Sequence, residues 1–162
     1  MKKIRILSGE KGQGKSSRLK EVFAGVPGAV GIITLRREGD LRDFYILSSG
    51  ESWSMQGAEN YAGPWLEVGR FRFSAEAFDR ASQYLLEAAR NTGTKLLIVD
   101  EVGPLELRNE GFYKALKEVM KNPAGPDLLL VVRSELVEEM KQFFAIPDAE
   151  LLNCESLKRD FL

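Results

Sequence analysis

The chain has 162 residues, 44% of them apolar and 29% charged, with a net charge of −1, one cysteine and no histidine. This length predicts one domain over residues 1–162, and the near-neutral charge gives no reason to expect binding to nucleic acid or to an anionic membrane. An internal disulfide and a Cys/His metal site are excluded, so a general base must be Asp, Glu, Lys or a metal-bound water. Because no apolar run reaches the ~20 residues of a membrane helix and no signal-peptide pattern follows Lys2 and Lys3, we expect a cytoplasmic protein.

Strand and helix patterns alternate along the sequence. In chain order we predict a strand at 2–8, a helix at 15–23, a strand at 30–34, a turn at 36–43, a strand at 44–47, a loop at 48–64, an extended segment at 65–73, a helix at 75–90, a strand at 95–100, a helix at 109–121, a strand at 128–132, a helix at 134–144 and a short strand at 151–152. Ser74 is the expected N-cap of the second helix. The alternation predicts an α/β fold with three layers, in which helices flank a mostly parallel sheet.

A glycine-rich segment, GEKGQGKS, follows the first predicted strand and matches the pattern G-x-x-x-x-G-K-[ST]. Glycines allow the backbone to approach a phosphate closely, and successive N–H groups at the start of a helix attract an anion. We expect Lys15 to reach the β- and γ-phosphates of a nucleoside triphosphate, and the Ser16 hydroxyl to bind Mg²⁺. The predicted nucleotide-binding residues of this segment are Gly9, Glu10, Lys11, Gly12, Gln13, Gly14, Lys15, Ser16 and Ser17.

Two acids stand together after an apolar run. Asp100 is the last residue of the run KLLIVD, and Glu101 is the first residue after it. Ligands of parallel sheets lie beyond the carboxyl ends of the strands, so Asp100 is the expected partner of Ser16 in holding Mg²⁺. Glu101 is expected to orient or deprotonate the attacking water, which makes it a predicted catalytic residue together with Lys15. The sequence DEVG also fits the loose D-x-x-G pattern of GTPases, but no N-K-x-D follows, so we do not expect a dedicated GTP switch.

Several segments resemble the small nucleoside-triphosphatase family first described from thermophiles, which includes the human cancer-related nucleoside-triphosphatase. They are the P-loop GEKGQGKSS, the segments GIIT and FYILSSG, VGRFRFSAEAFDR, VDEVGPLEL, and a terminal N-x5-R that ends at Arg159. The resemblance implies a P-loop NTPase fold with a β-hairpin insertion. It also implies slow, Mg²⁺-dependent hydrolysis of ATP, GTP and other triphosphates to diphosphates, with Arg159 near the nucleotide. Glu106 matches a second acid of the family, either with a role at the site or as a stabiliser of a helix start.

The resemblance has departures, and the residues leave alternatives open. Pro104 stands where the family has a lysine after D-E-I-G, so a catalytic role of that lysine does not carry over. Lys158 replaces an asparagine and Leu35 replaces an acid, so the family's preference for a nucleotide base does not carry over either. A nucleotide or small-molecule kinase, and a nucleotide-dependent binding switch or adaptor, remain alternatives to a hydrolase. The aromatic residues Trp53, Tyr61 and Trp65 lie in or beside loop 48–64, where they either pack or contact a ligand. The arginines that are candidates for stabilising transition-state charge are Arg36, Arg37, Arg108, Arg133 and Arg159.

Overall fold

The computed structural model describes residues 2–10 and 14–157, and most of its strands belong to one sheet. In spatial order this sheet contains β4 (Ser52–Ser54), β3 (Arg42–Ile46), β2 (Ala29–Arg36), β7 (Leu96–Val99), β8 (Asp127–Arg133), β1 (Ile4–Gly9) and β9 (Glu150–Leu152). Five neighbouring strands, β2, β7, β8, β1 and β9, are parallel to one another. Strands β3 and β4 extend the sheet beyond β2, each antiparallel to its neighbour. Strand β8 therefore lies between β1, which precedes the glycine-rich segment, and β7, which precedes Asp100.

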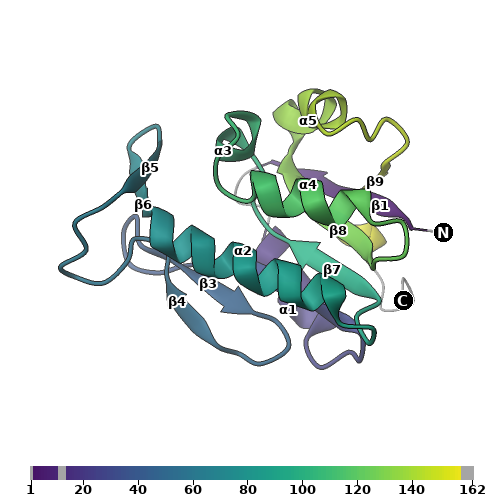
Figure 1. Cartoon of the computed structure of the whole chain (residues 1–162), viewed down its shortest axis with the longest axis horizontal. Helices are drawn as coiled ribbons and strands as arrows, with labels where there is room; N and C mark the ends of the chain where they lie inside the picture. Colours follow the sequence, from purple (N-terminus) through teal and green to yellow (C-terminus); the bar gives the residue numbers. More distant parts are fainter. Residues whose placement is uncertain (1, 11–13, 158–162) are drawn as a thin grey trace.

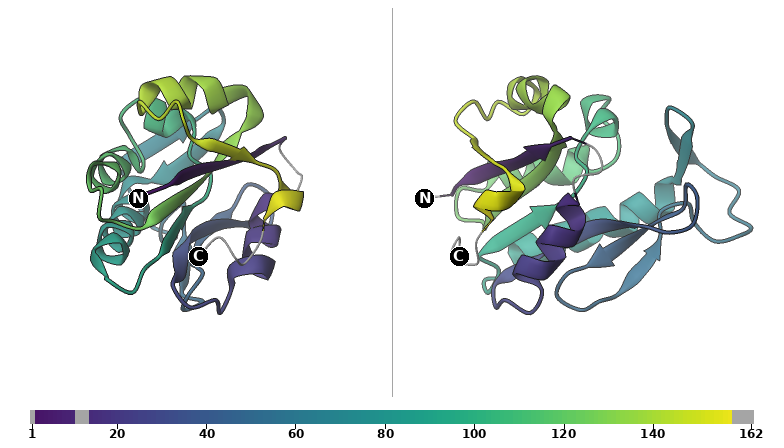
Figure 2. Two further views of the ribbon diagram at one scale, coloured as in Figure 1. Left: turned by 90° about the vertical axis from the view of Figure 1, so that its right-hand side faces the viewer. Right: turned by 180° about the vertical axis from the view of Figure 1, so that it is seen from behind.

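Helices cover both faces of the sheet and form the outer two of three layers (Figures 1 and 2). The helices are α1 (Lys15–Phe23), α2 (Ala75–Arg90), α3 (Pro104–Leu107), α4 (Tyr113–Lys121) and α5 (Val137–Phe143), with short 3-10 turns at Ser134–Leu136 and Cys154–Ser156. Side chains of α2, α4 and α5 share one hydrophobic cluster with the sheet, while α1 packs into a separate cluster on the opposite face. The predicted three-layer α/β fold with a mostly parallel sheet is confirmed.

A second, two-stranded sheet forms a hairpin of β5 (Trp65–Val68) and β6 (Phe71–Ser74), which projects at one end of the molecule (Figure 1). It corresponds to the predicted extended segment 65–73, and a β-hairpin is thus present as expected. Ser74 ends β6 and caps α2, because its hydroxyl accepts a hydrogen bond of 3.0 Å from the backbone N–H of Ala77. The predicted N-cap is therefore confirmed, and it fixes the point at which the hairpin turns into a long helix.

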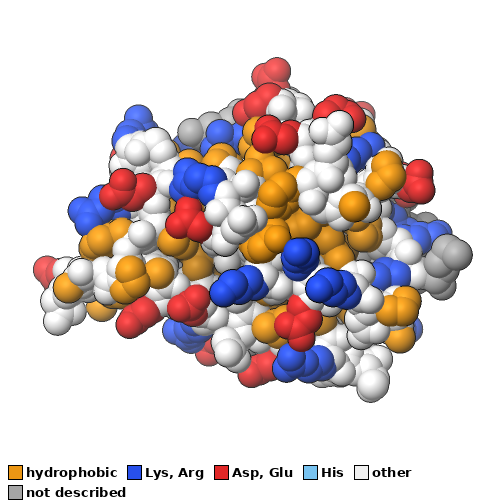
Figure 3. Space-filling model, turned by 45° about the horizontal axis from the view of Figure 1, so that its top comes forward, with side chains coloured by type: hydrophobic (Ala, Val, Ile, Leu, Met, Phe, Trp, Pro, Cys, Tyr) orange, Lys and Arg blue, Asp and Glu red, His pale blue; other side chains and the backbone are white. Residues whose placement is uncertain are grey.

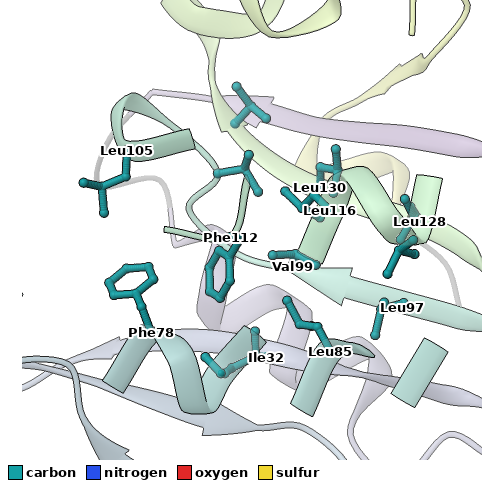
Figure 4. Close-up of a cluster of buried hydrophobic side chains, with 14 of the residues drawn as sticks. Ile32, Phe78, Leu85, Leu97, Val99, Leu105, Phe112, Leu116, Leu128 and Leu130 are labelled. Atoms are coloured by element: carbon teal, nitrogen blue, oxygen red, sulfur yellow. The ribbon is translucent and has the colours of Figure 1, made fainter. Parts of the chain in front are cut away.

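The core follows from the sequence periodicity. Every residue of β7 is buried, as is typical of a central strand with a helix layer on each face. Helix α2 turns Ala77, Phe78, Ala81 and Leu85 toward the sheet, one stripe of an amphipathic helix. Figure 4 shows Leu85, Leu97 and Leu128 packed together along this interface, with Phe78, Leu105 and Phe112 at the other end. That second end of the core lies beside the candidate site described below.

Several segments differ from the prediction. The predicted loop 48–64 contains strand β4, whose three residues extend the β3 edge without a strong hydrophobic pattern of their own. The predicted helix 109–121 begins only at Tyr113, because Asn109 and Gly111 have φ angles of 65° and 63°, in the left-handed region that interrupts an α-helix. The short helix α3 precedes this interruption and was not predicted.

No helix formed by residues 2–10 and 14–157 is long and apolar enough to cross a membrane. On the face shown in Figure 3, acidic and basic side chains are interspersed around a patch of hydrophobic side chains. This mixed surface matches the near-neutral net charge of the sequence.

Candidate active site

A pocket of about 290 Å³ opens at the carboxyl ends of the central strands, beside the start of α1. Its polar half is lined by Gly14, Lys15 and Ser16 from the start of α1, by Thr34 from the end of β2, and by Asp100 after β7. The carboxyl edge of an open parallel sheet is the place where such folds bind ligands. The structure therefore brings the two predicted motifs, which are separated by more than eighty residues, to one place.

The start of α1 is shaped by Gly14, which has φ 73° and ψ 28° as the residue before the helix. A residue with a side chain would be strained in this left-handed conformation, so the glycine allows the chain to turn sharply into the helix. Lys15 begins the helix as predicted, and its Nζ donates to the carbonyl oxygens of Gly9 (3.3 Å) and Glu10 (2.8 Å). Of the predicted nucleotide-binding residues, Lys11, Gly12, Gln13 and Arg159 lie outside the described residues.

Asp100 is almost completely buried, with 1% of its surface exposed, and its carboxylate accepts several hydrogen bonds. Its Oδ2 accepts from the Ser16 hydroxyl (2.5 Å), from the Thr34 N–H (3.0 Å) and at 3.4 Å from the Thr34 hydroxyl. Burial raises the pKa of Asp100 to about 6, and the nearby charge of Glu101 adds to the increase, while the Ser16 and backbone donors oppose it. The acid thus joins the helix after β1 to the ends of β2 and β7.

Thr34 was not singled out by the sequence motifs, yet it holds Asp100 through both its backbone and its side chain. Its position follows from the strand order: β2 and β7 are neighbouring parallel strands, and the residues at the carboxyl ends of such strands meet at one edge of the sheet. The pairing of Ile32 with Val99 places Thr34 near Asp100. The neighbour relation itself, however, depends on the strand order, which no local pattern reveals.

Glu101 follows Asp100 and reaches into the pocket with a side chain that is 44% exposed. Its φ of 53° lies in the left-handed region, a conformation that costs a non-glycine residue about 1–3 kcal/mol and is concentrated at functional sites. Both carboxylate oxygens accept from Nη1 of Arg42, at 3.0 and 2.9 Å. The guanidinium of Arg42 also lies 4.9 Å from the ring centre of Phe71. Glu101 is thus held at the pocket by a specific cation.

Arg42 is a second pocket residue that sequence reasoning missed, because residues 36–43 were predicted to be a polar turn. It is only 8% exposed and belongs to β3, in which buried Arg42, Phe44 and Ile46 alternate with partly exposed residues. This period of two was the signal that could have extended the predicted strand toward Arg42. A buried arginine in line with Phe44 and Ile46 indicates a cation that has a defined partner inside the fold.

Glu106 is also buried, with 1% exposed, and it lines the same pocket while binding backbone groups. Its Oε1 accepts from the N–H of Gly103 (2.7 Å), and its Oε2 accepts from the N–H of Phe112 (2.9 Å). Burial raises its pKa to about 7, against the effect of these donors. Glu106 therefore ties together the two ends of the segment that contains α3, as a helix-start stabiliser does.

The other candidate residues divide between pocket and surface. Arg36 and Arg133 line the pocket. Arg37 instead pairs with Asp43 at 2.9 Å. Arg108 pairs with Glu110 at 3.0 Å. The three aromatic candidates have packing contacts: Nε1 of Trp53 donates to the carbonyl of Ala77 at 3.1 Å, and Tyr61 and Trp65 meet edge to face at 4.9 Å.

Comparison with known proteins adds sequence relatives. The nucleoside-triphosphatase THEP1 of Methanosarcina barkeri is 29% identical over 152 residues, which cover 86% of this chain and 84% of that protein. The nucleoside-triphosphatase THEP1 of Pyrococcus abyssi is 34% identical over a shorter stretch of 74 residues, covering 46% of this chain and 40% of that protein.

Solved structures share the fold. The crystal structure of THEP1 from the hyperthermophile Aquifex aeolicus matches with a TM-score of 0.70 at 20% identity, covering 93% of this chain and 89% of that one. The solution structure of a human cancer-related nucleoside triphosphatase matches with a TM-score of 0.66 at 23% identity, covering 93% and 88%. A family model described as NTPase matches residues 5–162, nearly the whole sequence. The chain therefore belongs to the NTPase family, in agreement with the resemblance of its motifs.

Proposed function

We propose that the chain is a Mg²⁺-dependent nucleoside-triphosphatase that hydrolyses ATP, GTP and related triphosphates to the diphosphate and phosphate. The observation that carries this proposal is that Ser16 and Asp100 meet in one pocket beside Glu101. The Ser16 hydroxyl oxygen lies 2.5 Å from Oδ2 of Asp100. The names of the THEP1 relatives point to the same activity.

The residues present fit Mg²⁺. This ion prefers oxygen ligands, keeps several waters, and is usually held by one or two carboxylates together with substrate phosphates. Ser16 and Asp100 offer a hydroxyl and a carboxylate in contact with each other. Among residues 2–10 and 14–157, no group of three or more acidic, cysteine or histidine side chains could hold a metal by itself. When bound, Mg²⁺ would neutralise charge on the β- and γ-phosphate oxygens.

The chain's own groups would divide the remaining work. Lys15 would exchange its two carbonyl partners for the β- and γ-phosphates, and the N–H groups at the start of α1 would bind phosphate oxygens. Glu101 would accept a proton from the water whose oxygen bonds to the γ-phosphorus, as the bond from that phosphorus to the β–γ bridging oxygen breaks. Arg42 would keep the Glu101 carboxylate pointed at this water.

The test is steady-state phosphate release from ATP, GTP, CTP and UTP with Mg²⁺, for the wild type and for Lys15→Ala and Glu101→Gln. We expect the wild type to turn over several triphosphates and Glu101→Gln to lose at least about 100-fold in kcat while still binding nucleotide, because general bases contribute about 10²–10⁴-fold. Glu139→Gln, which changes an exposed acid on α5, is the matched control and should behave as the wild type. Tight binding of nucleotide by the wild type without phosphate release would show the proposal to be wrong.

A further inference from the structure

The pocket has a second half, and its chemistry differs from that of the phosphate end. Beyond Glu101 its walls are the rings of Phe71, Phe73, Phe78 and Phe112 and the side chains of Val68 and Leu105. These residues come from the hairpin β5–β6, from α2, and from the segment that contains α3. A triphosphate has no apolar group at its terminal phosphate, so the proposed hydrolysis gives this apolar half no task.

The apolar walls are built from well-packed rings. Phe78 contacts Phe112 and Phe73 with ring centres 5.2 and 6.0 Å apart, and Phe71 stacks on Phe73. Figure 4 shows Leu105 and Phe78 facing one another from α3 and α2, beside Phe112. Protein interiors rarely keep voids larger than a water molecule, so an open space between packed rings indicates a site for a ligand.

The position of Glu101 decides which ligand the apolar half can face. Arg42 binds Glu101 and lies over the ring of Phe71, so the catalytic carboxylate stands at the border between the two halves. In the proposed reaction Glu101 acts at the γ-phosphorus. The nucleoside is attached to the other end of the triphosphate, at the α-phosphate. The apolar half therefore faces the terminal phosphate and not the nucleotide base.

We propose that the apolar half binds a second, organic substrate, a small aromatic molecule with a hydroxyl group, which accepts the γ-phosphoryl group. This inference rests on the proposed nucleotide site. The acceptor oxygen forms a bond to the γ-phosphorus, and the bond between that phosphorus and the β–γ bridging oxygen breaks. The nucleoside diphosphate leaves with the bridging oxygen, and the hydroxyl proton passes to Glu101 and then to solvent.

The arrangement explains how one carboxylate serves two acceptors. A ring held against the half-buried Phe71 and Val68, with Phe78 and Phe112 packed behind them, would place its hydroxyl at Glu101 in a fixed geometry. Such positioning can supply much of the rate of a two-substrate reaction. When no ring is bound, water reaches the same carboxylate. Hydrolysis is then the reaction of the enzyme without its organic acceptor.

The experiment uses benzyl alcohol and 2-phenylethanol as probes, with benzyl methyl ether as the matched compound that has no transferable hydroxyl. Binding is measured by saturation-transfer NMR, and transfer by ³¹P NMR of the phosphate monoester and by the ratio of diphosphate to phosphate released from Mg-ATP. Val68→Phe places a ring inside the apolar half. Glu67→Phe adds the same ring to the exposed face of the same strand and is the control, with folding checked by thermal unfolding.

We expect all three probes to bind the wild type, and the two alcohols alone to give a monoester, so that diphosphate release exceeds phosphate release. Val68→Phe should weaken probe binding and transfer at least tenfold, while Glu67→Phe should not.

The inference is overturned if no probe binds, if Val68→Phe leaves probe binding unchanged, or if ATP yields phosphate alone with an alcohol bound. A loss of ATP affinity in Val68→Phe without a change in probe binding would assign the space to the base and also overturn it. ATP hydrolysis by the wild type without monoester would leave the proposed function standing, whereas absence of any turnover would refute both.

Discussion

The end of β7 and the segment around α3 each bury one carboxylate, and the two acids differ in what they bind. Asp100 and Glu106 are each 1% exposed. Asp100 accepts from the hydroxyls of Ser16 and Thr34 as well as from backbone N–H groups. Glu106 accepts from the backbone N–H groups of the segment that it closes.

Burial by itself therefore does not separate an acid with exchangeable partners from an acid that only holds the backbone. A hydroxyl can rotate to another acceptor or share its oxygen with a metal ion, so the two hydroxyl partners of Asp100, from Ser16 and Thr34, are exchangeable. A backbone N–H is fixed by the chain, and leaving it without an acceptor inside the protein costs about 1–3 kcal/mol. The partners of Glu106 therefore cannot be released without distorting α3.

Replacing Asp100 by Asn should remove activity at a limited cost in stability. The amide keeps the volume of the acid and avoids the cost of burying a charge, but it is a poor ligand for Mg²⁺. Its NH₂ group must also face the N–H of either Thr34 or Glu101, from which it cannot accept a hydrogen bond. We expect turnover to fall by about 10³-fold, the upper range for loss of one electrostatic group, with a loss of about 1–2 kcal/mol in unfolding free energy. Phosphate release at several Mg²⁺ concentrations and urea unfolding would measure both quantities. A fall in stability as large as the loss of activity would make Asp100 a structural acid.

Glu106→Ala should show the opposite pattern. It leaves the N–H groups of Gly103 and Phe112 without acceptors and opens a cavity, so we expect a loss of about 3 kcal/mol in unfolding free energy. Glu110→Ala, in the same segment but with a side chain 41% exposed, is the control and should change stability by less than about 0.5 kcal/mol. Urea unfolding of both variants checks this. Equal stabilities for the two would contradict the role given to Glu106.

The pKa of Glu106 predicts a pH dependence of stability. Because the folded-state pKa of about 7 lies above the ordinary value of 4.5, folding disfavours the ionised form. The contribution of this group is fully present below pH 4.5 and is lost as the pH rises through 7, by about 2 kcal/mol between pH 5 and 7. Glu106→Gln cannot ionise, so the difference in unfolding free energy between it and the wild type should change with pH by that amount. A constant difference would mean that the acid keeps an ordinary pKa.

Arg42→Ala should have the smallest effect, about a tenfold loss in kcat with nucleotide affinity unchanged, because it frees Glu101 without removing it. Arg42→Lys should recover part of the loss, since a lysine keeps the charge but lacks the planar guanidinium that lies over the ring of Phe71. Arg37→Ala is the control, because it breaks a nearby arginine–acid pair with a more exposed arginine. An unchanged kcat in Arg42→Ala would show that Glu101 needs no cation to hold it.

The sequence predicted the parts of the fold that local rules determine. The bounds of α1 and α2 were predicted to the residue, because a glycine-rich turn and the Ser74 cap mark their starts and their apolar stripes are regular. The two motifs around Ser16 and Asp100 were also found, since each carries its own spacing. Their convergence could be expected from the rule that parallel strands place ligands at one edge.

The parts that were missed depend on tertiary contacts. Strand β4 exists because the edge of β3 accepts it, and its residues Ser52–Ser54 give little signal of their own. Arg42 was predicted to lie in a polar turn. The alternation of Arg42, Phe44 and Ile46 could have extended the strand, but the pairing with Glu101 depends on the tertiary fold. The late start of α4 at Tyr113 accompanies the hydrogen bond from the Phe112 N–H to Glu106, a side-chain contact that the helical periodicity of the sequence does not show.

The strand order also governs when the protein can acquire its site during synthesis. Strand β1 pairs with β8 and β9, which lie near the other end of the sequence. Until these strands leave the ribosome, the strand that carries Ser16 into place has no edge to join, and the contact with Asp100 spans the empty position of β8. The contact between Ser16 and Asp100 can therefore form in its final place only after β8 has been synthesised and has paired with both β1 and β7.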